Sequence, residues 1–217
     1  MKFAGPVFVL ILLTDFAAAQ IVGAQLDSVV KTKKMIEEVA RQSFPEIKLH
    51  KIRVKTFESR KSFFKARYSV WRYATFQRMR HLVFVNPGAF ERKLPEQAFR
   101  SIVAHELAHV SYYTRKNRFE LLGLLRLMNS EAEAGFERKA DLEAIARGYG
   151  EGLIEYRDWL NEQLTKVESA KKSRTYFTSE EIRLVIRALA EKPGLMERWK
   201  RDVPRDIEEI KNDMGYG

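Results

Sequence analysis

Residues 97–113 read QAFRSIVAHELAHVSYY, and this stretch decides the fold because it predicts a helix that the rest of the chain must cover. Pro95 stands at a position suited to the first turn of a helix, and Glu96 beside it suits the positive end of the helix dipole. The predicted helix runs from Pro95 to about Thr114. Its central residues are too apolar for an exposed helix, namely Ile102, Val103, Leu107, Ala108 and Val110.

Within this helix, residues 105–109 read HELAH. Side chains four apart point the same way on a helix, so His105 and His109 can each present an imidazole nitrogen to one metal ion, with Glu106 beside the open coordination position. The chain has only four histidines, and its composition yields such a match by chance roughly 0.007 times. The pattern predicts one zinc ion per chain, with Glu106 as general base. The alternative is a pair of surface histidines, with Glu106 making an ordinary helix contact.

A catalytic zinc site needs a third protein ligand, and no histidine follows His109. The downstream run FERKAD places Glu137 and Asp141 four apart on one face of a helix. We expect Glu137 to complete a His₂Glu set and Asp141 to accept the second ring proton of a ligand histidine. The alternative is that both carboxylates face solvent beside Arg138 and Lys139. Three other carboxylates compete for the ligand position, namely Glu131, Glu133 and Glu143.

Upstream of this helix the composition favours strands. The stretch Lys48–Phe57 alternates apolar and basic residues, with one irregularity at His50 and Lys51, and predicts a half-buried strand. Between Phe63 and Val85, β-branched and aromatic residues predict two paired strands that end at the turn Asn86-Pro87-Gly88.

Two features of these predicted strands bear on function. The part from Tyr68 to Thr75 could form an open sheet edge that pairs with an extended substrate. His50 and His81 have no partner at metal-ligand spacing, and we expect them to be structural or surface residues within the strands.

The remaining segments have helical patterns. We expect Gly148 and Gly150 to end the helix that carries FERKAD, and a polar loop to cover Ser169–Ser173. Capping boxes at Ser130/Glu133 and Thr178/Glu181 mark two helix starts. The predicted helices are Asp27–Gln42, Phe119–Met128, Ser130–Arg147, Leu153–Leu164, Thr178–Leu189 and a last one that ends near Met214.

The composition narrows the class of protein. With 45% hydrophobic and 31% charged residues and few glycines or prolines, the 217-residue chain is neither collagen-like nor disordered. It has no cysteine, so any metal must be held by histidines and carboxylates. The net charge of +10 is consistent with an anionic envelope surface as a partner, and the alternative is a solvated surface that keeps the protein soluble. No motif for sequence-specific nucleic-acid binding is present in the sequence.

The N-terminus has the pattern of a secretory leader. Lys2 precedes the apolar stretch Phe3–Leu13, and Ala17–Ala19 supply the small residues that signal peptidase reads. We expect residues 1–19 to be a signal peptide cleaved between Ala19 and Gln20, because the apolar run is shorter than the ~20 residues that span a bilayer. The alternative is a retained anchor.

Residues 20–217 would then form a single zinc metallopeptidase domain without a transmembrane segment, exported to the periplasm or the extracellular space. We expect residues 171–217 to be a C-terminal helical extension packed on that domain. Export of a cysteine-free protein favours a bacterial periplasm.

Together these motifs resemble the gluzincin metallopeptidases, and more closely the periplasmic type of the HtpX/BepA-like family that includes the CaaX prenyl proteases. The resemblance spans roughly residues 69–165 and includes the strand that ends at Asn86, the HELAH motif, the FERKAD motif and the RGYG turn. It implies an α+β, zincin-like fold that is predominantly helical, with a small N-terminal sheet containing antiparallel strands packed on the active-site helices. It also implies zinc bound by His105, His109 and Glu137, water activated by Glu106, and Asp141 supporting a ligand.

We therefore expect a zinc endopeptidase acting on proteins or peptides of the cell envelope. Glu106 would take a proton from the attacking water and pass it to the leaving amine. A donor to the developing oxyanion is also expected. The family often has a His-Pro pair where this chain has Thr175-Tyr176-Phe177, and the candidate donors are Tyr149, Tyr156 and Tyr176.

Two other classes of function stay open. One is a zinc-fold binding or chaperone-like module without turnover, although a purely structural site needs no general base. The other is an interaction protein that uses its basic surface on anionic envelope polymers.

Overall fold

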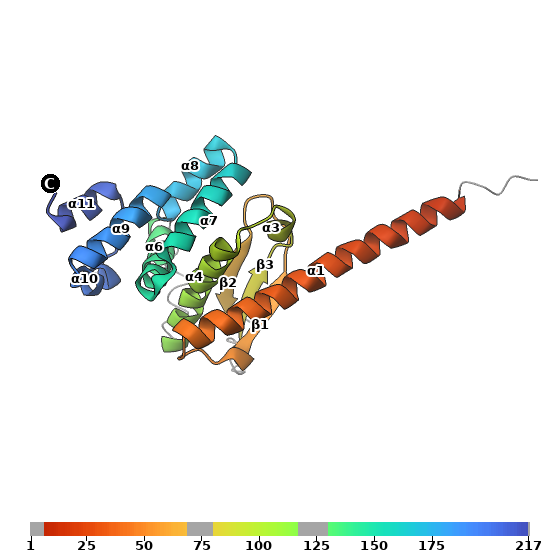
Figure 1. The fold of residues 1–217 in the computed structure, drawn as a ribbon, viewed down its shortest axis with the longest axis horizontal. Helices are drawn as coiled ribbons and strands as arrows, with labels where there is room; N and C mark the ends of the chain where they lie inside the picture. The colour runs from red at the N-terminus through yellow and green to blue at the C-terminus, as the bar shows by residue number, and fades with distance from the viewer. Residues whose placement is uncertain (1–6, 69–79, 117–129, 217) are drawn as a thin grey trace, which may run out of the picture.

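The computed structural model describes residues 7–68, 80–116 and 130–216, with side chains from Val22 onward except that of Tyr68 (Figure 1). These residues form a mostly helical fold with one three-stranded mixed sheet, which confirms the α+β class. The helix expected at Phe119–Met128 lies outside the described residues.

The first described element is the long helix α1 (Val7–Ser43), which includes the first predicted helix and continues upstream through the expected cleavage position. Its N-terminal half extends away from the other elements in Figure 1, and Val22, Leu26 and Val30 on it are exposed. Its C-terminal half contributes buried residues such as Val39 to the core. Among the residues whose side chains are described, no helix is both long and apolar enough to cross a membrane.

Three short strands form the sheet: β1 (Ile52–Thr56), β2 (Phe64–Tyr68) and β3 (His81–Val85). β3 lies in the middle, parallel to β1 and antiparallel to β2. The two paired strands expected before Asn86 are thereby confirmed. The first expected strand is shorter than predicted, because the irregularity in its alternation falls in a 3₁₀ turn, η1 (Leu49–Lys51).

Helix α4 (Glu96–Arg115) is the predicted buried helix, and it follows the short helix α3 (Gly88–Glu91). Pro95 is its N-cap and not its first residue, so the helix begins one residue later than expected. Thirteen of its residues are buried, because β2, α1 and two later helices all pack against it. The HELAH motif therefore lies in the interior of the fold.

The second motif reaches α4 through three consecutive segments: helix α6 (Ser130–Ala144), a π-helical turn η2 (Ile145–Tyr149) and helix α7 (Gly150–Gln163). Gly148 has a φ of 90°, so the expected break at this glycine is confirmed. Gly150, by contrast, begins α7 and does not end a helix. Both α6 and α7 pack against α4.

Four helices complete the chain: α8 (Lys166–Thr175), α9 (Ser179–Glu191), α10 (Leu195–Arg201) and α11 (Ile207–Met214). The capping box that opens α9 and the helix end at Met214 are confirmed. The polar loop expected at residues 169–173 is wrong, because these residues lie within α8. A capping box of Thr165 and Glu168 stabilises the start of this helix, which buries none of its own residues.

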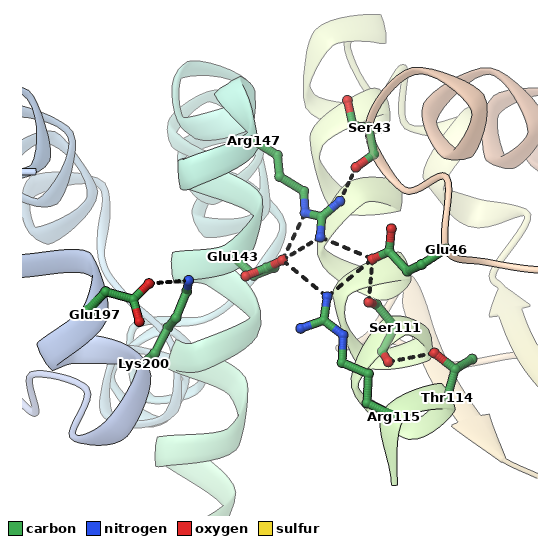
Figure 2. A network of polar contacts seen from close by, with 9 residues as sticks. All are labelled: Ser43, Glu46, Ser111, Thr114, Arg115, Glu143, Arg147, Glu197 and Lys200. Atoms are coloured by element: carbon green, nitrogen blue, oxygen red, sulfur yellow. Dashed lines mark hydrogen bonds and ion pairs between the residues drawn. The ribbon is translucent and has the colours of Figure 1, made fainter.

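A network of charged side chains joins α4, α6 and the loop after α1 (Figure 2). Arg147 donates to Glu143 at 2.6 Å and to Glu46 at 3.0 Å. Arg115 and Ser111 of α4 donate to the same Glu46 oxygen at 3.3 and 2.6 Å. Because these groups come from segments far apart in the sequence, the network fixes α6 relative to α4, and these two helices carry the candidate site.

Candidate metal centre

Three side-chain atoms from α4 and α6 converge in the way that a metal site requires. His105 Nε2 lies 3.1 Å from His109 Nε2, and Glu137 Oε2 lies 3.1 and 3.0 Å from these two nitrogens. A tetrahedral zinc site with bonds of ~2.05 Å has ligand atoms about 3.3 Å apart. The three atoms thus stand close to the spacing of zinc ligands, and together they could hold a metal ion.

The hydrogen bonding of His105 shows why a cation fits between these atoms. Its Nδ1 donates to Asp141 Oδ1 at 2.8 Å, so Nε2 is left to face Glu137 and His109. Burial disfavours the imidazolium, but the carboxylates of Asp141 and Glu137 outweigh it and raise the pKa of His105 to about 10. A proton is thus held where a metal ion would be bound, and a divalent cation could replace it.

Asp141 is completely buried and orients His105. Arg157 of α7 donates to both of its carboxylate oxygens at 2.7 and 2.9 Å, and the Phe177 N–H donates at 3.2 Å. Burial raises the pKa of Asp141, but Arg157 and His105 outweigh this effect and lower it. The carboxylate therefore stays ionised and fixes the orientation of the His105 ring.

Sequence reasoning missed Arg157, although a signal was present. This arginine stands in the helix that was expected at residues 153–164, where its neighbours Tyr156 and Leu160 are buried. A buried arginine needs an anionic partner, and Asp141 was the available carboxylate on a neighbouring motif.

Glu106 has the environment of a general base. It is only 4% exposed, and the backbone N–H of Ala66 in β2 donates to its carboxylate. Its Oε2 has no hydrogen-bond partner among the described residues. Burial raises the pKa of Glu106 although His105 and His109 oppose the shift. A carboxylate with one free oxygen and a raised pKa is suited to accept a proton from water.

A cleft of about 710 Å³ opens onto these groups. Glu106, His109 and Glu137 lie along it, β2 forms one wall, and the segment from Leu164 to Tyr176 forms the other. β2 is an edge strand of the described sheet. The open edge that we expected at residues 68–75 lies outside the described residues from position 69 onward.

The three candidate tyrosines lie in different places. Tyr176 lines the cleft, with its ring 6.0 Å from that of His105, and burial raises its pKa well above 10, which keeps the hydroxyl protonated. Tyr156 lines a small recess beside Glu106. The hydroxyl of Tyr149 lies 2.8 Å from Ser43 Oγ, in hydrogen-bonding contact, and does not line the cleft. Of the three tyrosines, Tyr176 is the one that lines the cleft next to His105.

The competing carboxylates lie outside the triad. Glu143 belongs to the network of Figure 2, Glu131 is exposed, and Glu133 lies on the rim of the cleft. Arg138, considered as a solvent-facing partner of Glu137, is instead buried and donates to Glu181 of α9 at 3.0 Å. Glu137 is therefore free to face the histidines.

The two remaining histidines contribute no atom to the triad. His50 is exposed and lies in η1 and not in a strand. His81 is buried in β3 with its ring stacked 6.5 Å from that of Tyr113, and burial lowers its pKa to about 4, so it is neutral at pH 7.

No protein-family model, curated protein or solved structure matches this chain. The assignment of a function therefore depends on the chemistry of the site.

Proposed function

We propose that this protein is a zinc-dependent endopeptidase of the gluzincin type, similar to the HtpX/BepA-like family, that cleaves proteins or peptides of the cell envelope. The observation that carries the proposal is the convergence of His105, His109 and Glu137 beside a buried Glu106 with one free oxygen, at the floor of a cleft. A purely structural metal site needs neither a carboxylate with a free oxygen nor an open cleft.

Zinc bound by the triad would supply a Lewis acid that polarises a peptide carbonyl and acidifies water. Glu106 accepts the proton of the attacking water and delivers it to the leaving amine. Tyr176 donates to the carbonyl oxygen as negative charge develops on it. Asp141, held by Arg157, keeps the His105 ring in one orientation throughout.

The test compares metal content and proteolysis in four proteins purified without chelator: wild type, Glu106→Gln, Glu137→Ala and Glu133→Ala. Glu133 is the matched control, because it stands on the same helix at the rim of the cleft and outside the triad. We expect one zinc per chain in all except Glu137→Ala, and casein cleavage only by wild type and Glu133→Ala.

Each deviation has a distinct meaning. Zinc in wild type without any casein cleavage would leave a binding or chaperone-like module. Cleavage unchanged in Glu106→Gln would exclude Glu106 as the general base. Zinc binding that persists in Glu137→Ala and is lost in Glu133→Ala would move the third ligand to the other carboxylate. A wild-type protein that binds no divalent metal would refute the proposal as a whole.

A further inference from the structure

The cleft carries an excess of positive charge outside the metal centre. Apart from Glu106 and Glu137, its charged lining residues are five cations and two carboxylates. Lys61 and Glu168 form an ion pair of 2.9 Å across the cleft, between the loop before β2 and α8. The cations that remain are Lys65 and Arg67 on β2 and Lys171 and Lys172 on α8.

These four cations form no close ion pair in the part of the chain that the structure describes. None of them forms an ion pair there, whereas many other surface cations of the fold do so. Lys65 lies over the ring of Phe57 at 4.5 Å, and Lys172 lies over the ring of Tyr176 at 5.0 Å. Contacts with aromatic faces hold the ammonium groups in place without neutralising them.

Lys172 is the cation closest to the chemistry. It lines both the cleft and the small recess that contains Glu106, and it is half-buried. Burial lowers its pKa, and Arg157 and Lys65 lower it further, against the effects of Glu137 and Glu106. A partly desolvated ammonium group among other cations gains free energy when an anion enters beside it.

We propose that the cleft selects peptides that carry carboxylates beside the scissile bond, with Lys172 contacting a substrate carboxylate and Lys65, Arg67 and Lys171 strengthening its attraction. The inference rests on the proposed function and names its substrate class. An acidic peptide fits better than a bulk polyanion. The cations line both walls of a groove with the candidate general base at its floor, and the apolar residues Phe64 and Phe136 also line this groove and suit peptide side chains.

Direct binding tests this without turnover. Zinc-loaded Glu106→Gln is titrated with fluorescent peptides of equal length in which the central residues are Asp and Glu or their amides Asn and Gln. We expect the acidic peptide to bind at least about tenfold more tightly at 50 mM salt, and the ratio to shrink towards one at 500 mM salt, because screening weakens charge attraction.

Replacing Lys172 with Met in the same background should lower the ratio of the acidic peptide's affinity to the amide peptide's affinity about tenfold. Lys171→Met should lower this ratio less. Lys166→Met is the matched control, because Lys166 is exposed on the same helix and does not line the cleft. Equal binding of both peptides, or an equal loss for both in Lys172→Met, would overturn the proposal. The proposal would also be overturned if Lys172→Met weakened the binding of a single-stranded oligonucleotide more than it weakened the binding of the acidic peptide.

Failure of the proposed function would look different. Wild-type protein that binds acidic peptides selectively but cleaves neither them nor casein would refute the peptidase and leave an acidic-peptide binding site. Wild-type protein that cleaves both peptides with equal kcat/KM would support the peptidase and refute the acidic specificity.

Discussion

The buried charged groups at this site form a series in which each group is paired with a neighbour of opposite charge. Glu137 and Asp141 face opposite ring nitrogens of His105, and Arg157 neutralises Asp141 from the other side. Arg157 also donates to the Phe177 carbonyl at 3.0 Å, which connects the segment before α9 to the candidate metal centre. The same contacts therefore place the neighbouring residue, Tyr176, at the cleft.

The role of the Tyr176 hydroxyl can be separated from the role of the ring. We expect Tyr176→Phe to lower kcat about 10² to 10³-fold with zinc content unchanged, because only the donor to the developing oxyanion is lost. Steady-state kinetics on a fluorogenic peptide, with metal analysis of the same samples, measures this. Tyr149→Phe is the control: it loses its contact with Ser43 away from the cleft, so kcat should stay the same and stability should fall by about 1 kcal/mol. A Tyr176→Phe enzyme with wild-type kcat would exclude this hydroxyl as the donor.

At the scale of elements, the close contact between α4 and α7 positions Arg157 near the candidate metal centre. Gly152 makes the contact possible, because a Cβ there would overlap Ser101 Oγ and lie 2.5 Å from the carbonyl oxygen of Gln97. Any side chain at this position would separate the two helices. Arg157 would then be displaced from Asp141, which stands on a third helix.

We expect Gly152→Ala to destabilise the fold by about 1–3 kcal/mol through this overlap, even though alanine favours helices. Gly135→Ala on α6 is the matched control, because nothing lies within 4 Å of its added Cβ and the helix should gain about 0.5–1 kcal/mol. Chemical denaturation of the three proteins measures both effects. A Gly152→Ala protein as stable as wild type would show that the helices can move apart at no cost.

At the scale of the whole molecule, the buried charges of the candidate metal centre link stability to pH. In the metal-free protein the pKa of His105 is about 10, against 6.5 as its ordinary value. The stabilisation from this raised pKa is fully present below about pH 6.5 and is lost as the pH rises to 10. The pKa of Asp141 is lowered, so its contribution is present above about pH 4 and is lost in acid.

We therefore expect the Tm of wild-type protein in chelator to fall between pH 7 and pH 10. Excess zinc should raise the Tm more at pH 8 than at pH 6, because the metal must displace the His105 proton. Thermal unfolding across this range measures both trends, with His50→Gln as a control at an exposed histidine. His105→Gln should remove most of the pH dependence. A metal-free Tm that is constant from pH 7 to pH 10 would contradict the linkage.

Local sequence patterns were sufficient to predict the α4 helix, the paired strands β2 and β3, the capping box of α9 and the break at Gly148. Each of these depends on residues a few positions apart. The convergence of His105, His109 and Glu137 could be expected from the sequence as well, because i,i+4 spacing fixes which residues share a helix face and metal chemistry selects the partners.

Other features were decided only by the tertiary structure. Arg157 lies 16 residues after Asp141 on another helix, and the contact between them depends on how closely α7 approaches α4. The choice among Tyr149, Tyr156 and Tyr176, and the cations that α8 brings to the cleft opposite β2, depend likewise on packing between distant segments. Periodicity describes which face of an element is apolar, but it does not specify which other element covers that face or at what distance.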